Sequence, residues 1–325
     1  MFTASERTNQ SSVVPVTFPL TPMQRGMLFH TLLAPESGGY IEQMVAELEE
    51  DLRIDLFREI WQQAIDRHPV LRAQFRWEGV TEPVQEIAQE AALPWKVEDW
   101  RSRAPELQQV DLDNHLKADR TKGFALDRPP LMRVALFQRA DRSWWFVLSS
   151  HHLLMDGRSR RVLLLEVFGA YAAKLRGESQ SFPEFRPFSG YLEFLKTRDA
   201  AADQTYWRSQ LSGFEAPNVL RFQQTSGETH KQTAVTAEKA VRLPEALTVA
   251  LNHHAEQEGV TLNTVLQAAW ALLLQFYSGQ DDVLFGVIRS CRRSGLPGGE
   301  NTVGLFQRGM LVGAHPLPLL ARGAQ

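Results

Sequence analysis

The residues best suited to chemistry lie in one short run, His-His-Leu-Leu-Met-Asp-Gly, which contains His151, His152, Asp156 and Gly157. A histidine can take up and release a proton near neutral pH, because its unperturbed pKa is about 6.5. An aspartate four residues after His152 could orient a histidine, pair with an arginine or cap a helix, and the sequence leaves these three roles open. The run therefore offers the groups that general acid–base chemistry uses.

Histidine and aspartate are also metal-ligand types, so a metal site has to be weighed. Successive side chains of a strand point to opposite faces, and His151 and His152 cannot both face one cavity if the strand continues through them. No other His or Cys cluster in the sequence has ligand spacing. We therefore expect one histidine to be chemical, the other to be structural, and no metal to be bound.

Two apolar elements must position this run. Residues 144–150 are aromatic and β-branched, which predicts a buried strand. Residues 159–176 carry apolar side chains at helical spacing and end in Lys174, Arg176 and Gly177, which predicts a helix with a clear stop. The run thus lies on a turn between a strand and a helix, where catalytic groups are often held.

The run resembles the HHxxxDG signature of the condensation domains of nonribosomal peptide synthetases, which share a fold with chloramphenicol acetyltransferase. Four other segments resemble motifs of the same family and occur in the family's order: residues 20–30, 67–72, 206–211 and 303–306. The resemblance covers about residues 15 to 306. It implies acyl transfer, in which the amine of an acceptor attacks a donor thioester and forms an amide bond.

The resemblance also implies roles for the signature residues. His152 is expected in the substrate channel, either as the general base or as the group that positions the amine, and the sequence does not separate these roles. His151 is expected to orient the loop, and Gly157 to allow close approach of the backbone to the substrate. Asp156 is expected to be a structural anion and not a base.

Arg67 and Arg72 are the predicted partners of that anion. They flank the junction between a predicted helix, residues 56–67, and a predicted strand, residues 70–77. In the resembled family, arginines at these two places form ion pairs near the signature aspartate, which is Asp156 here. The alternative is that both arginines are solvated, since exposed charges are the rule in proteins.

The family works on substrates carried by other proteins. The resemblance implies donor and acceptor peptidyl carrier proteins as partners, other synthetase modules beside them, and substrates presented on phosphopantetheine, with no cofactor bound directly. The sequence has no Gly-x-Ser-x-Gly elbow, phosphate loop or dinucleotide fingerprint, so neither a serine acyl-enzyme nor ATP or NAD is expected. The opening motif, residues 22–30, looks more like domains that take a D-configured donor.

Composition sets further limits. A formal net charge of -3 gives no reason to expect nucleic acid or an anionic membrane as partner. Cys291 is the only cysteine and cannot form an internal disulfide, which favours the cytoplasm. Residues 1–12 lack the apolar region of a signal peptide, and the longest apolar stretches, such as residues 268–274, are far shorter than the roughly 20 residues of a membrane span.

The alternation of predicted strands and helices gives an α/β class, an α+β sandwich. We expect two chloramphenicol-acetyltransferase-like lobes of which the second is incomplete, because the family continues well past residue 306. The predicted boundaries are a disordered leader, residues 1–14, an N-terminal lobe, residues 15–177, an interlobe linker, residues 178–190, a partial C-terminal lobe, residues 191–306, and an atypical tail, residues 307–325.

Three functions fit this organisation. The first is a condensation enzyme. The second is a truncated, inactive remnant or a module that only binds carrier proteins, since an incomplete lobe would expose the apolar face of a predicted helix, residues 261–276. The third is an acyltransferase of the same fold that uses coenzyme A thioesters and a free acceptor.

Overall fold

The computed structural model describes residues 16–179, 182, 184, 186–214, 218–220, 239–292 and 299–314 of the chain. The chain divides into two compact units, which we call unit 1 (Met1–Arg198 and Ser290–Arg308) and unit 2 (Asp199–Arg289 and Gly309–Gln325). The predicted leader, residues 1–14, lies outside the described residues, and so do parts of the predicted linker. The lobe boundaries given above stay predictions.

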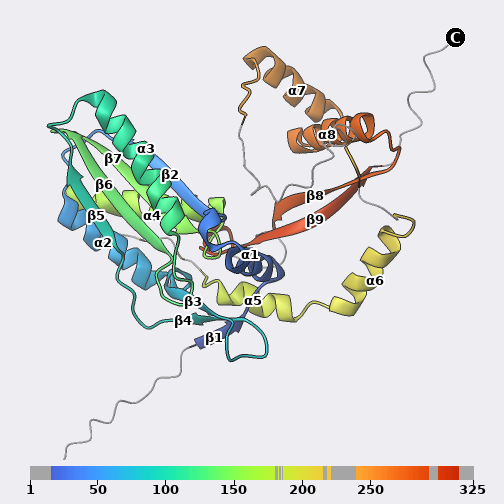
Figure 1. Ribbon diagram of the computed structural model, residues 1–325, viewed down its shortest axis with the longest axis horizontal. Helices are drawn as coiled ribbons and strands as arrows, with labels where there is room; N and C mark the ends of the chain where they lie inside the picture. The colour runs from blue at the N-terminus through green and yellow to red at the C-terminus, as the bar shows by residue number, and fades with distance from the viewer. Residues whose placement is uncertain are drawn as a thin grey trace, which may run out of the picture. The chain divides into compact units, whose positions relative to one another are not determined.

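Unit 1 is built on a four-stranded sheet of β2 (Ile41–Leu48), β5 (Trp95–Asp99), β6 (Met132–Ala140) and β7 (Ser143–His151). The strand order is β2-β7-β6-β5 (Figure 1). β7 pairs antiparallel with both of its neighbours, and β5 pairs parallel with β6. The predicted buried strand is therefore a central strand of this sheet.

Helices cover both faces of the sheet. α2 (Ile54–Arg67) and α4 (Gly157–Leu175) pack on one face, and α3 (Pro105–Lys122) packs on the other. Side chains of β7 alternate between these layers, as the period of a strand requires. Those facing α2 and α4 are Trp144, Phe146 and Leu148, and those facing α3 are Trp145 and Val147. The predicted mixed α/β class is confirmed.

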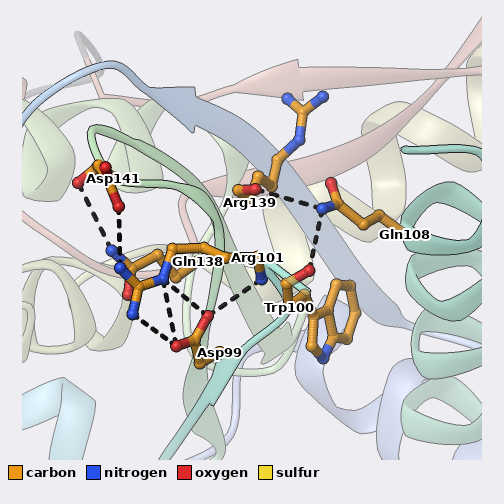
Figure 2. Close-up of polar contacts among 7 residues, drawn as sticks. All are labelled: Asp99, Trp100, Arg101, Gln108, Gln138, Arg139 and Asp141. Atoms are coloured by element: carbon orange, nitrogen blue, oxygen red, sulfur yellow. Dashed lines mark hydrogen bonds and ion pairs between the residues drawn. The ribbon is translucent and has the colours of Figure 1, made fainter. Parts of the chain in front are cut away.

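Buried polar contacts attach α3 to the sheet (Figure 2). The side-chain amide of Gln108 donates to the carbonyl oxygens of Trp100 at 3.0 Å and Arg139 at 3.2 Å. Beside them, on the surface, hydrogen bonds from Arg101 hold the pKa of Asp99 down at about 2. The bonds of Gln108 join α3 to the edge of the sheet that is remote from the two histidines.

A second sheet in unit 1 consists of β1 (Val16–Pro19), β3 (Ala73–Arg76) and β4 (Val84–Ile87) in the antiparallel order β1-β4-β3. The sequence predicts one strand over residues 70–77. That prediction is wrong for its first residues, because Pro69–Arg72 forms a 3-10 helix, η2. Proline at the first position favours such a turn, and the alternating pattern becomes a strand only after it.

α1 (Pro22–Leu33) begins with a capping box. Thr21 Oγ1 accepts from the backbone of Gln24 at 3.2 Å, and Gln24 Oε1 accepts from the backbone of Thr21 at 3.0 Å. The amide of Gln24 also donates to the carbonyl of Leu153 at 3.1 Å. This bond joins α1 to the loop after the two histidines. A short 3-10 helix, η1 (Pro35–Ser37), follows α1.

The last part of unit 1, Ser290–Arg308, is separated in sequence from the rest of the unit. It includes the 3-10 helix η4 (Gly299–Asn301) and the buried Leu305 and Phe306. The Phe306 ring packs against Tyr191 of α5 (Ser189–Lys196), with the ring centroids 4.7 Å apart. The Val-Gly-Leu-Phe motif is therefore part of the core of unit 1.

Unit 2 contains α6 (Ala200–Gln210), α7 (Glu245–Gln257) and α8 (Leu262–Ser278), with β8 (Val283–Ser290) paired to β9 (Gln307–Ala314). β9 occupies the first residues of the predicted atypical tail. Residues 239–243 form no strand. They lead directly into Pro244, the N-cap of α7.

α8 corresponds to the predicted helix over residues 261–276, and its N-cap is Thr261, whose hydroxyl accepts from the backbone of Thr264 at 3.2 Å. Large apolar side chains of this helix are exposed, among them Trp270 at 50%, Leu272 at 60% and Phe276 at 78%. In the part of the chain that can be described, no single helix is long and apolar enough to cross a membrane. α7 and α8 reach that length and composition only as a pair, bent by 101°.

Candidate active site

The two histidines of the signature lie at the end of β7 and meet different surroundings. His151 is opposite Ile41 in the register of β2 and β7, whereas the backbone N–H of His152 donates to the carbonyl of Tyr40 at 2.8 Å. His151 is the last residue of β7 and His152 follows in the turn, so the two imidazoles have different neighbours. His151 is fully buried, and the side chain of His152 is 16% exposed.

The hydrogen bonds of His151 assign its tautomer. Its Nδ1 accepts from the backbone N–H of Leu153 at 3.1 Å, so the proton of the neutral ring is on Nε2. Nε2 lies 3.2 Å from Oγ1 of Thr31, which itself donates to the carbonyl of Met27 at 2.8 Å. Nε2 is therefore the donor to Thr31. Burial, with a smaller contribution from His152, lowers the pKa of His151 to about 4, so the ring is neutral at pH 7.

His152 has the opposite arrangement. Its Nδ1 lies 2.8 Å from the carbonyl oxygen of Met155, and because a carbonyl only accepts, Nδ1 carries the proton. Nε2 of the neutral ring then has a free lone pair. A carboxylate oxygen, Oε1 of Glu42, lies 3.8 Å from Nε2. His152 is thus held in a fixed orientation with its basic nitrogen available.

Asp156 pairs with an arginine and also caps a helix. Its Oδ1 accepts from the backbone of Ser159 at 2.8 Å, which caps the N-terminus of α4, and from Nη2 of Arg292 at 2.8 Å. Its Oδ2 accepts from the backbone of Phe306 at 3.1 Å. The side chains of Asp156 and Arg292 are 2% and 3% exposed. Asp156 is therefore a buried structural anion.

The prediction that Arg67 and Arg72 pair with Asp156 is wrong. Arg67 forms an ion pair with Glu166 of α4, with 3.0 Å between Nε and Oε1, and Arg72 donates to the carbonyl of Gln89 at 2.9 Å. The arginine on Asp156 is Arg292, 136 residues away in sequence. The resemblance predicts an arginine there, but spacing along the chain cannot tell which of several arginines reaches it.

Arg292 also forms hydrogen bonds and an aromatic contact with other residues. It donates to the carbonyl of Gly299 at 3.0 Å and to Oγ of Ser159, and its guanidinium lies 4.3 Å over the centre of the Phe306 ring. Burial lowers the pKa of Arg292, and the charge of Asp156 opposes this shift. The sequence signal for this residue is the tripeptide Ser-Cys-Arg, which resembles the Ser-Gly-Arg strand end of the family.

Gly157 is the first residue of α4. A Cβ built at this position would meet only Nη2 of Arg160, at 3.8 Å, which is ordinary van der Waals contact. The fold itself therefore tolerates a side chain here. Close approach of a substrate to this backbone remains the predicted reason for glycine.

Glu42 and Arg160 belong to the same site, and sequence reasoning missed both. Nη1 of Arg160 lies 2.8 Å from Oε2 of Glu42, and their side chains are 24% and 28% exposed. Glu42 comes from β2 and Arg160 from the first turn of α4. The register of β2 on β7, which the sequence does not give, is what brings Glu42 to His152.

A cavity of about 580 Å³ lies on the His151 side of the sheet, where Thr31, Ile41 and Phe124 are among its lining residues. His151 lines it too, but both of its ring nitrogens are already bonded. It therefore offers no free acceptor to a molecule in that cavity. Among the residues that the structure describes, no group of three or more His, Cys, Asp or Glu side chains could hold a metal ion.

Comparison with known proteins agrees with this geometry. A family model described as "Condensation domain" matches residues 15–308. A linear gramicidin synthase of Brevibacillus parabrevis is 38% identical over 292 residues, which are 89% of this chain and 4% of that protein. Bacitracin synthase 3 of Bacillus licheniformis is 36% identical over 289 residues, again 89% of this chain and 4% of that protein.

A solved structure shares the fold. The first condensation domain of the calcium-dependent antibiotic synthetase, in complex with a substrate analogue, superimposes with a TM-score of 0.74 at 20% identity. The alignment covers 93% of this chain and 70% of that one.

Proposed function

This chain belongs to the condensation-domain family of nonribosomal peptide synthetases, and we propose that it forms an amide bond between a thioester-bound donor and the amine of a thioester-bound acceptor. The chain spans about 4% of the length of the two curated relatives described above. The activity, substrates and partners of those synthases are therefore proposals for this chain.

The reaction exchanges one bond for another at the donor carbonyl. The amine nitrogen bonds to the carbonyl carbon, the carbon–sulfur bond breaks, and the proton lost by the amine ends on the departing sulfur. The attacking nitrogen becomes more acidic as its bond forms, so a nearby base lowers the barrier. A fixed, unprotonated nitrogen close to the amine can take up this proton.

One observation carries the proposal: the Nδ1–H of His152 is bound to the carbonyl of Met155, which leaves the Nε2 lone pair open. We assign to Nε2 the contact with the amine, either as the acceptor of its proton or as the group that positions it. His151 then holds the loop from the other face, and Asp156 with Arg292 holds the start of α4. Gly157 leaves room for the substrate beside that helix start.

The partners follow from family membership. We propose that donor and acceptor carrier proteins present the two thioesters on phosphopantetheine, that other synthetase modules act beside this one, and that the cytoplasm is the compartment. No cofactor bound to the chain itself enters this scheme, because the reaction involves neither redox chemistry nor phosphoryl transfer.

The test uses the full chain with excised carrier proteins. The donor carrier is loaded with D- and L-amino acids in turn, the acceptor carrier with L-amino acids, and amide products are measured by mass spectrometry. We expect product with wild type and a fall of at least about 100-fold with His152→Ala, the usual scale for a lost general base. His253→Ala, at an exposed position on α7, is the matched control and should keep full activity.

Three outcomes would contradict the proposal. Amide formation that is unchanged in His152→Ala would remove the assigned role of Nε2. Turnover of coenzyme A thioesters with free amines, and none with carrier proteins, would indicate the related acyltransferase instead. Carrier binding without any product would indicate a binding module.

A further inference from the structure

Glu42 and His152 are diagonal neighbours on one face of the sheet. Glu42 pairs with Ser150 across β2 and β7, and the next position along this face brings His152 opposite Tyr40. Diagonal neighbours are about 7–8 Å apart along the backbone, within reach of long side chains. Here Oε1 of Glu42 comes to 3.8 Å from Nε2 of His152.

Both of these atoms are hydrogen-bond acceptors. In the neutral ring Nε2 holds a lone pair, because the ring proton is then on Nδ1, bound to Met155, and a carboxylate has no donor. A separation of 3.8 Å is also too long for a hydrogen bond between them. Two acceptors side by side leave a place for one donor atom with two hydrogens, since a nitrogen at roughly 2.9 Å from each can bridge them.

Arg160 fixes which oxygen of Glu42 is available. Its Nη1 binds Oε2 at 2.8 Å, so Oε1 remains directed toward His152. The side chains of Glu42 and His152 are only 28% and 16% exposed, so a substrate group can reach them while much of the surrounding water is excluded. A charge-assisted hydrogen bond is stronger in such a site than on an open surface.

We propose that Glu42 binds the attacking amine and holds it jointly with Nε2 of His152. The inference rests on the proposed function and adds a second residue that holds the amine. A neutral primary amine has two N–H groups, one for each acceptor, and keeps its lone pair for the donor carbonyl. As the C–N bond forms, one of these protons passes to Nε2, and it is returned to sulfur when the C–S bond breaks.

The first test is steady-state kinetics of the full chain with Glu42→Gln. The donor carrier is held at saturation, and the acceptor is varied as its aminoacyl thioester of N-acetylcysteamine. Loss of the carboxylate charge should raise KM for the acceptor about tenfold, since hydrogen bonds to charged groups are the stronger kind. KM for the donor should stay within about twofold of wild type, because Glu42 does not touch the donor in this scheme.

The second test compares each acceptor with its N-methyl form. A neutral secondary amine has a single N–H and cannot serve both acceptors. Wild type should therefore prefer the primary amine, and Glu42→Gln should show a smaller preference. Glu42→Asp restores the charge one methylene further back, so its acceptor KM should lie between those of wild type and Glu42→Gln.

Glu47→Gln is the matched control. Glu47 is on the same strand and also pairs with an arginine, Arg139 at 2.9 Å, but within the described residues no contact joins it to His152. An unchanged acceptor KM in Glu42→Gln would overturn the role of Glu42, as would an equal loss of donor and acceptor binding. No amide product from wild type would instead overturn the proposed function, and this inference with it.

Discussion

The two adjacent histidines differ because each Nδ1 meets a different backbone group. Nδ1 of His151 faces an N–H, and Nδ1 of His152 faces a carbonyl. The sequence predicts that the rings lie on opposite faces, because alternation is a property of any strand. It does not predict their tautomers, since these depend on the turn that folds Leu153 and Met155 back onto the rings.

Burial of His151 should make folding stability depend on pH. Its folded-state pKa of about 4 lies below the ordinary value of 6.5, so between these values the unfolded chain binds more protons and acid destabilises the fold. The contribution is complete above pH 6.5 and is lost as the pH falls toward 4. We expect the free energy of unfolding to drop by about 2 kcal/mol from this residue between pH 7 and pH 5.

Urea unfolding of wild type and His151→Gln at both pH values measures this difference. The variant is less stable at either pH, but its stability should depend less on pH than that of wild type. The exposed His253→Gln should keep the pH dependence of wild type. An identical pH dependence in wild type and His151→Gln would contradict the buried, neutral assignment.

At the scale of elements, the N-terminus of α4 is held by the segment that follows β8. Asp156 joins the cap of α4 to Arg292 and to the backbone of Phe306. Local signals predict elements such as the helix over residues 261–276, which is α8 and begins after the cap Thr261. They say nothing about which distant element supplies a partner.

Asp156→Asn should destabilise the protein strongly. Removing one partner of a buried ion pair leaves the other charge unpaired, and the expected loss is about 3–5 kcal/mol in the free energy of unfolding. The double variant Asp156→Asn, Arg292→Gln should cost less than the sum of its two single variants, because the groups act as a unit. Denaturant unfolding of the three variants measures this coupling.

The exposed cluster of Arg101 with Asp99 and Asp141 supplies the control, since Arg101→Gln breaks two ion pairs of similar length, 2.7 and 2.9 Å, on the surface. This variant should keep a stability close to that of wild type. Additive losses at Asp156 and Arg292 would contradict the claim that they stabilise one another.

At the scale of the whole molecule, the order of the motifs predicts the family and the mixed α/β class, because several motifs in a fixed order specify a fold more narrowly than composition does. The ion pair of Arg67 and the hydrogen bond of Arg72 could not be predicted, since each depends on which element packs beside the arginine. The donor and acceptor amino acids are not readable either, because pockets are built from residues scattered along the chain. Every residue assigned a chemical role here lies in unit 1.

The open Nε2 of His152 is the feature on which the proposed function depends, and its protonation can be measured directly. Nitrogen NMR of the full chain with ¹⁵N-labelled histidine, assigned with His151→Gln and His152→Ala, reports the tautomer of each ring. We predict that neutral His152 carries its proton on Nδ1 and His151 carries its proton on Nε2. A proton on Nε2 of neutral His152 would contradict the account, because that nitrogen could not then accept a proton from the amine.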